Sequence, residues 1–217
     1  MKKNIIAAIA FAGISISSFA SGMVAEKFEL GGGLGYSVPI SGGFSFDYKG
    51  SVNLSVYGAY KINDLLSGGL EISYDLGHDS KAFTWGTAVS PSGDTVVKNW
   101  QITPFVKASK GFNMGNIKAK GYGIIGLGMY LYQATYKSAT SASLLSALSA
   151  NTTKLGFNLG GGISVALVSS MPNLDFVLDF RWHHVFDGYQ ELDFITGYIT
   201  TRAINIITPS LRVGYHF

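Results

Sequence analysis

The sequence predicts an all-β chain, an eight-stranded antiparallel up-and-down transmembrane β-barrel preceded by a signal peptide. Three observations carry this prediction. Eight segments alternate apolar with small or polar residues, which is the period of a β-strand. Short and long connections alternate between these segments, and the bulky side chains gather on one phase of each. We therefore divide the chain into a signal peptide at residues 1–20 and a barrel at residues 21–217.

The N-terminus has the three parts of a secretory signal peptide. The opening MKK is positively charged, residues 5–16 are an apolar core, and Ser18–Ala20 supplies small residues for cleavage. We expect cleavage after Ala20, with Ala25 as an alternative. A membrane anchor is the other interpretation, but the apolar run is short for a helical span. This segment predicts export.

Composition narrows the class of protein. Charged residues make up 13% of the chain, about half the share of roughly 25% that is usual in soluble domains. The sequence has no cysteine, which excludes disulfides, thiolate metal sites and lipid anchors on cysteine. After the signal peptide, no stretch approaches the ~20 apolar residues of a membrane helix. The sequence has no stripe of basic residues, so it does not predict a nucleic-acid partner.

The predicted strands follow one another along the barrel. They cover residues 26–38, 51–62, 68–78, 99–109, 116–136, 154–167, 173–186 and a last segment from about Ala203 to Phe217. The fifth is the most ambiguous. In the fourth, Pro104 lacks an N–H, which marks that strand for a β-bulge.

The connections differ in length. Residues 63–67, 113–116 and 169–173 are short turns rich in Asn, Gly and Pro, whereas residues 40–50, 78–98, 137–153 and 187–202 are long. SPSGD at residues 90–94 predicts a turn on which the third and fourth strands extend as a hairpin. Residues 141–150 fit a short helix or a Ser/Ala loop equally well. Short and long connections therefore fall at opposite ends of the sheet.

The apolar phase is predicted to face lipid, because the opposite phase is glycine-rich and carries the charges. An eight-stranded barrel is just wide enough inside for side chains, and hydrocarbon requires the sheet to close. The polar and charged residues predicted to face the lumen are Glu29, Glu71, Asp75, Lys107, Asp175, Asp179, Arg181, His183, Arg212 and His216. They could line a water path or form a buried ionic plug, and we favour the plug because buried charges must be paired. The aromatics expected in interfacial girdles are Tyr36, Tyr60, Trp100, Trp182 and Tyr215.

The chain ends PSLRVGYHF, with Leu211, Val213, Tyr215 and Phe217 on the apolar phase. This ending resembles the C-terminal signal of bacterial outer-membrane barrels, which their assembly machinery reads, and the resemblance assigns that role to Tyr215 and Phe217. With the eight-segment layout, it makes the chain similar to the small opacity-like and OmpW-like barrel families.

That resemblance implies a monomer in the outer membrane of a Gram-negative-type bacterium, exported through the periplasm. Its partners would be the lipid bilayer, lipopolysaccharide and the barrel assembly machinery, with no cofactor. The OmpW-like family implies a small porin-like conduit that passes small apolar molecules sideways into the membrane. The alternative is a closed-core barrel that serves as an adhesin, interaction or structural protein at the cell surface through four long outer loops.

Sequence motifs for chemistry are weak. GGGLGY at residues 31–36 continues as a strand, which argues against a phosphate loop. In RWHHVFDGY, His183 and His184 lie on opposite faces of a strand and cannot chelate one metal; we expect His183 to pair with Asp179, and His184 to lie near the outer rim. Lipid A-deacylating barrels have a Ser two residues after their His, but Val185 and Phe186 follow His184 here. The hydrolase is therefore a remote alternative, and no catalytic or metal-binding residue is predicted.

Overall fold

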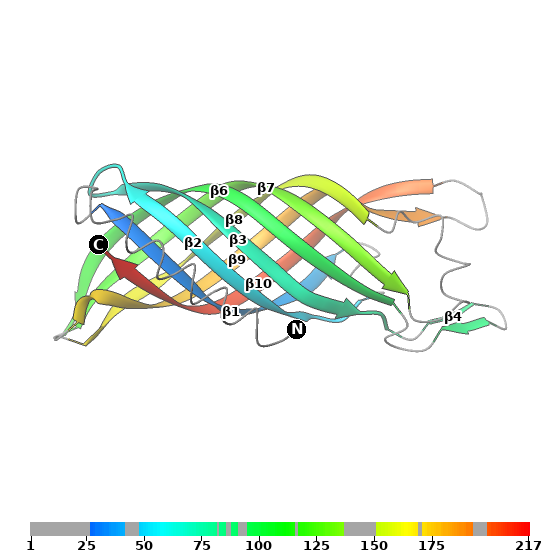
Figure 1. Cartoon of the computed structure of the whole chain (residues 1–217), viewed down its shortest axis with the longest axis horizontal. Helices are drawn as coiled ribbons and strands as arrows, with labels where there is room; N and C mark the ends of the chain where they lie inside the picture. Colours follow the sequence, from blue (N-terminus) through cyan, green and yellow to red (C-terminus); the bar gives the residue numbers. More distant parts are fainter. Residues whose placement is uncertain are drawn as a thin grey trace.

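The computed structural model describes residues 27–41, 48–81, 83–85, 88–90, 95–115, 117–136, 151–168, 171–192 and 199–217. The predicted signal peptide, the SPSGD turn and the Ser/Ala segment at residues 141–150 fall wholly or largely outside these residues. Eight long strands close into one antiparallel barrel in the order β1-β10-β9-β8-β7-β6-β3-β2, as Figure 1 shows. The predicted fold class is confirmed.

Except for β2, which has 11 residues, the barrel strands are longer than a membrane crossing of ~9–11 residues requires. Their bounds are β1 Phe28–Ser41, β2 Ser51–Lys61, β3 Leu66–Asp79, β6 Thr95–Met114, β7 Ile117–Tyr136, β8 Asn151–Val168, β9 Met171–Leu192 and β10 Ile199–His216. Two short strands, β4 (Phe83–Trp85) and β5 (Ala88–Ser90), pair with each other. The β3–β6 ladder ends at Asp79 and Val96, so the expected extension of these two strands as one hairpin turning at SPSGD is wrong.

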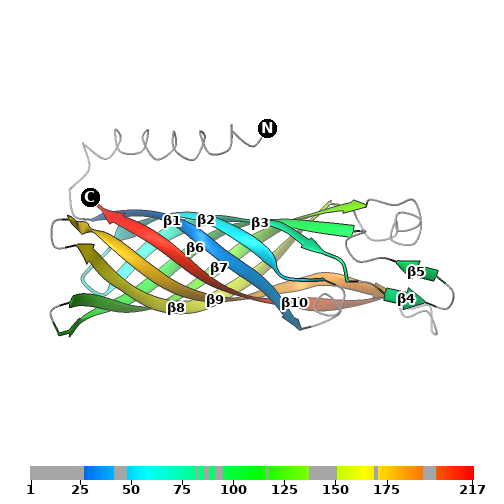
Figure 2. The same cartoon turned by 90° about the horizontal axis from the view of Figure 1, so that it is seen from below.

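The two ends of the barrel differ. The end that we call the turn end carries Phe28, Phe217 and the connections at residues 62–65, 115–116 and 169–170. The opposite end, called the loop end, carries the connections at residues 42–50, 80–94, 137–150 and 193–198. Figure 2 shows the C-terminus at the turn end and β4 and β5 beyond the loop end. The predicted separation of short and long connections is therefore present.

Local chemistry explains the turns and the closure. The Asn63 side-chain oxygen accepts hydrogen bonds from the N–H groups of Leu65 and Leu66, at 2.9 and 2.8 Å, which closes the first turn. The Phe217 N–H donates to the Phe28 carbonyl at 2.9 Å, next to the β1–β10 ladder that closes the barrel.

One irregularity lies elsewhere than predicted. Pro104 of β6 pairs with Leu70 of β3 without a shift of register, so a bulge at Pro104 is wrong. The register shifts instead between Asp75 and His78, where Gly77 has a φ of 151° that residues with a side chain rarely adopt. The bulge therefore lies at Gly77, a residue that has no Cβ and so tolerates this backbone conformation.

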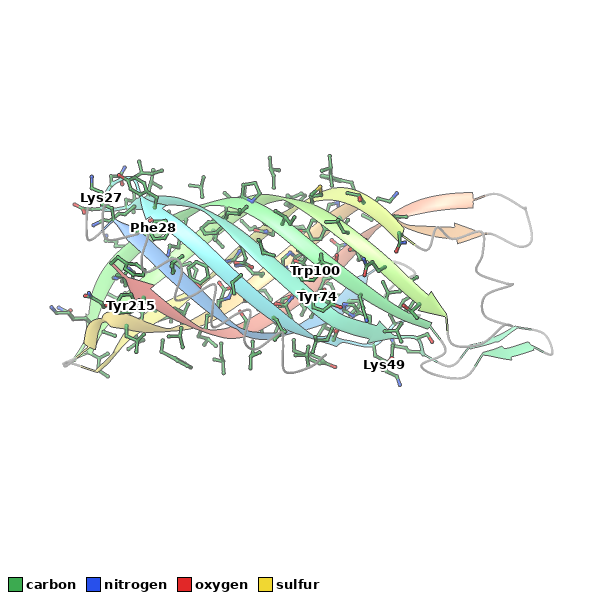
Figure 3. All side chains as sticks on the ribbon, viewed as in Figure 1. Lys27, Phe28, Lys49, Tyr74, Trp100 and Tyr215 are labelled. Atoms are coloured by element: carbon green, nitrogen blue, oxygen red, sulfur yellow. The ribbon has the colours of Figure 1, made fainter. Side chains whose placement is uncertain are left out.

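The outward face of the barrel is apolar. Leu127, Leu155 and Leu34 are 72%, 68% and 61% exposed, and Figure 3 shows such side chains projecting from the wall all around. Inward residues such as Glu71 and Asp179 are buried. Apolar side chains on a closed sheet suit hydrocarbon as the surrounding solvent, so the exterior is a membrane-facing surface. In the described segments, no helix has the length and hydropathy to cross a membrane.

Candidate functional site

The lumen contains a cluster of four buried charges, which we call the ionic layer: Glu71, Asp179, Arg181 and Arg212. Arg212 donates to both Glu71 oxygens, at 2.5 and 3.2 Å, and lies 2.9 Å from Asp179 Oδ2. Arg181 donates from Nη2 to Glu71 at 3.1 Å and from Nε to Asp179 at 2.9 Å. Two cations thus face two anions in a layer whose side chains are at most 6% exposed.

The strand periodicity and the barrel topology assemble this layer. Asp179 and Arg181 are two residues apart on β9 and therefore share its inner face. Arg212 comes from the adjacent strand β10, where Ser210 pairs with Asp179. Glu71 comes from β3, which is separated from β10 by β1 and β2, so its bonds cross the lumen.

Glycines on the inner phase make room for the two arginines. A Cβ atom added at Gly33 would lie 2.7 Å from Arg212 Cγ, and one at Gly160 would lie 2.5 Å from Arg181 Cδ. Both distances are too short for real contacts. Gly33 of GGGLGY and Gly160 therefore leave room for the arginine that the adjacent strand places beside each of them.

A second polar layer surrounds Asp75, toward the loop end. The fully buried Asp75 carboxylate accepts hydrogen bonds from Ser37 at 2.6 Å, Asn53 at 2.8 Å and Gln101 at 3.2 Å. Asn99 and His78 also approach it, at 3.3 and 3.4 Å. Sequence reasoning missed these partners, although their place on the inner phase of β1, β2 and β6 was a usable signal.

The two adjacent histidines lie on opposite faces of β9, as their positions predict. His183 Nδ1 lies 3.1 Å from the Tyr130 hydroxyl inside the lumen, so its predicted pairing with Asp179 is wrong. The reason is that Arg181, Arg212 and the Tyr122 hydroxyl already occupy the Asp179 carboxylate.

The loop-end part of the lumen is closed by an apolar layer. Its members are Val97, Tyr130, Tyr132, Val185, Ile204 and Ile206. Tyr130, Val185 and Ile206 are 0% exposed, so the members fill the space themselves. Sequence reasoning missed this layer, although counting back from Arg212 in steps of two reaches Ile206 and Ile204.

At the turn end, the lumen opens into a cavity of about 440 Å³ that reaches Arg181 and Arg212. Near its mouth, Glu29 accepts hydrogen bonds from Lys107 at 2.5 Å and from the Tyr57 hydroxyl at 2.8 Å. The Lys107 ammonium also lies 5.9 Å from the centre of the Tyr57 ring.

The remaining predicted lumen residues line the same cavity. Asp175 contacts His216 Nε2 at 2.9 Å and accepts a hydrogen bond from Ser164 at 2.5 Å. The structure therefore places the predicted lumen residues in three groups, around Glu71, around Asp75 and at the turn-end mouth, except for His183, which contacts Tyr130 of the apolar layer. Within the described residues, no group of three or more His, Asp or Glu side chains is arranged to hold a metal.

Similarity to solved structures agrees with this architecture. The fold is similar to outer membrane protein OprG of Pseudomonas aeruginosa, with a TM-score of 0.53, 12% identity, and coverage of 89% of this chain and 96% of OprG. The chain has the fold of the small eight-stranded outer-membrane barrels. Such barrels, with an apolar exterior, reside in the bacterial outer membrane, which is the location of this chain.

Two further solved structures are similar to this outer-membrane barrel. Neisserial surface protein A has a TM-score of 0.48 at 14% identity, with coverage of 88% of this chain and 97% of that protein. Escherichia coli outer membrane protein W has a TM-score of 0.43 at 15% identity, with coverage of 90% and 100%. The sequence matches no protein-family model and no curated protein.

The C-terminal residues lie at the turn end of this outer-membrane barrel. Tyr215 is outward and 44% exposed, and its ring lies 4.9 Å from that of Phe217. Figure 3 shows Tyr215 at the same end as Phe28, whose ring lies 6.3 Å from that of Phe217. Their role as an assembly signal stays a prediction.

His184 lies on the outer wall of the outer-membrane barrel. Its Nδ1 is 2.8 Å from the Asn205 side-chain oxygen, and the rings of Phe157, Trp182 and Phe186 surround it at 5.1 to 5.8 Å. Phe186 stands where the lipid A deacylases have Ser. These aromatic neighbours favour a packing role for His184 in the aromatic belt of the wall over a catalytic role.

Proposed function

We propose that this outer-membrane barrel has a closed core and acts at the cell surface as an interaction or structural protein. One observation carries the proposal: two separate layers of the lumen, the ionic layer and the apolar layer, are filled by side chains that are almost wholly buried. A conduit that runs through the whole barrel would need a continuous path through both.

The physical obstacles to a path differ between the layers. Separating the ionic layer would leave charges unpaired in a region that water hardly reaches, at an expected cost of several kcal/mol. The apolar layer resists water entry because its side chains offer few hydrogen-bonding groups. Opening one layer would leave the other closed.

The loop end is then the part of the chain that is available for binding. Strands β6, β7 and β9 have 20, 20 and 22 residues and continue past the length needed to cross hydrocarbon. The β4–β5 hairpin adds surface there, and connecting segments on a rigid scaffold commonly carry binding functions.

Planar-bilayer conductance of the purified barrel tests the closed core. The protein should first show heat-modifiable gel migration, which reports a folded barrel. We then expect no stable conductance steps from the wild type. A stable pore whose conductance changes in Arg212→Ala would contradict the proposal.

The surface role needs a separate measurement. Cells that display the barrel should bind host matrix or surfaces better than cells displaying a variant in which residues 82–94 are replaced by a short Gly-Ser linker. Equal binding of both, with equal amounts of folded barrel at the surface, would argue against a role for the β4–β5 segment.

A conduit for small apolar molecules is the second candidate, and the apolar layer favours it. Its side chains, such as Ile204 and Ile206, would suit an apolar solute near the loop end. Uptake of a small apolar solute into vesicles distinguishes the two functions. The closed core predicts the same rate with and without the protein, whereas a conduit predicts a faster rate with it.

A further inference from the structure

The turn end carries three lysines that are not ion-paired within the described residues. Lys27, Lys110 and Lys118 are exposed, at the entrance to β1, near the end of β6 and at the start of β7. Other lysines at this end are neutralised: Lys61 lies 2.8 Å from Asp64 and Lys120 lies 3.5 Å from Asp175.

The acidic side chains at this end are already ion-paired. Glu29 and Asp175 lie inside the lumen, where Lys107 and His216 bind them. The hydrogen bond from Lys61 and its charge hold the pKa of the exposed Asp64 carboxyl below its usual value, so Asp64 is ionised and its pair with Lys61 is neutral at pH 7. The described outer rim of the turn end is therefore net cationic.

Each unpaired lysine is close in sequence to an apolar side chain at the edge of the wall. Phe28 follows Lys27, Ile117 precedes Lys118 and is 51% exposed, and Phe112, two residues after Lys110, is 42% exposed. Figure 3 shows Lys27 and Phe28 together at the turn end. Lys110 and Phe112 share the outward face of β6, because residues two apart point to the same side of a strand. A lysine stem can lie along apolar surface while its ammonium group reaches the headgroup region.

We propose that Lys27, Lys110 and Lys118, the turn-end lysines, form a binding surface for anionic phospholipid headgroups. The short turns make this end periplasmic, so the lipids belong to the periplasmic leaflet. Charge complementarity selects the occupant, because a cationic rim attracts anionic groups. The neighbouring apolar side chains place this rim at the edge of the hydrocarbon, which is where the phosphodiester groups of the lipids lie. Lys27 also lines the mouth of the turn-end cavity, but none of the three lysines belongs to the ionic or the apolar layer, so the surface does not depend on whether the core is closed.

The test compares two double variants at the same rim. Lys110→Gln with Lys118→Gln removes two unpaired charges, whereas Lys61→Gln with Asp64→Asn removes a neutral pair and leaves the net charge unchanged. Each barrel is reconstituted in vesicles of phosphatidylcholine with spin-labelled phosphatidylglycerol or spin-labelled phosphatidylcholine, and the association of each label with the protein is measured. All these positions are exposed, and heat-modifiable migration verifies folding.

We expect the wild type and the neutral-pair variant to prefer the anionic lipid. The preference should fall by up to about fivefold per lysine in the first variant, since a lysine near an anionic surface contributes about 1 kcal/mol. It should also fall in 1 M salt. An unchanged preference in Lys110→Gln/Lys118→Gln, or an equal loss in both variants, would overturn the proposal. If the wild type shows no lipid preference but binds anionic cell-wall fragments in a salt-dependent way, and Lys110→Gln/Lys118→Gln loses that binding, the lipid proposal is overturned and the surface is reassigned to that polymer.

Discussion

The ionic layer and the apolar layer close the same lumen by different means. In the ionic layer, Glu71, Asp179, Arg181 and Arg212 reach across the barrel, and each satisfies more than one partner. In the apolar layer, side chains such as Val185 and Ile206 exclude water only by filling volume. A barrel of this width can thus be closed by either chemistry, but the stability of the ionic layer depends far more on each of its members than that of the apolar layer does.

The largest expected effect is the loss of Arg212. Arg212→Ala leaves Glu71 and Asp179 with only Arg181 between them, and breaking a buried charge pair costs about 3–5 kcal/mol. Urea unfolding of the barrel in vesicles measures the free energy of unfolding. The double variant Arg212→Met with Glu71→Gln removes one charge of each sign and should recover most of the loss. A single variant as stable as the wild type would show that the layer is not energetically coupled.

A smaller loss is expected in the apolar layer. Ile206→Ala removes a fully buried side chain, and such changes cost about 2–4 kcal/mol through lost burial and the cavity left behind. The same unfolding measurement applies, with the outward Ile207→Ala as the matched control, because its side chain is only partly buried. Equal losses at both positions would mean that the layer is not tightly packed.

The space beside the arginines gives the next test. Gly160→Ala would push a methyl group into Arg181 Cδ and the Phe180 carbonyl, and overpacking of this kind costs about 1–3 kcal/mol. Gly123→Ala on the adjacent strand β7 is the control, because its nearest neighbouring atom is 4.0 Å away. Unfolding in urea should separate the two variants. If Gly160→Ala is neutral, the wall has enough freedom to move away from Arg181.

The strand period explains why the fold was predictable while the pairing was not. Alternation along residues 173–186 placed Phe176 outside and Asp179 inside, and a closed sheet leaves no other choice for apolar and charged phases. It could not tell which charges meet, because partners such as Glu71 and Arg212 are brought together by barrel closure and not by sequence separation. The pairing of His183 with Asp179 was therefore wrong.

The apolar layer was missed for a related reason. Ile204 and Ile206 obey the same alternation, but a cluster of bulky apolar residues on the inner phase was not anticipated, because that phase was expected to hold mainly glycines and charged residues. The bulge at Gly77 was likewise misplaced to Pro104, since a missing N–H is visible in a sequence and a positive φ is not. Periodicity identifies the side of the wall, while the filling of the lumen depends on three-dimensional neighbours.

The mouth of the turn-end cavity offers the smallest expected effect, and it separates burial from pairing as the source of sensitivity. Tyr57→Phe removes the hydroxyl that donates to Glu29, but Lys107 still neutralises the carboxylate. A hydrogen bond to a charged group contributes about 1.5–3 kcal/mol, and we expect the lower end at this mouth, where water can replace the hydroxyl, which is below the effect of Arg212→Ala. The control is Tyr60→Phe, whose outward side chain is 49% exposed and should matter less. If Tyr57→Phe lowers the free energy of unfolding as much as Arg212→Ala does, then contacts at the water-accessible mouth contribute as much as those in the ionic layer. Burial would then not be the reason why the ionic layer is sensitive to substitution.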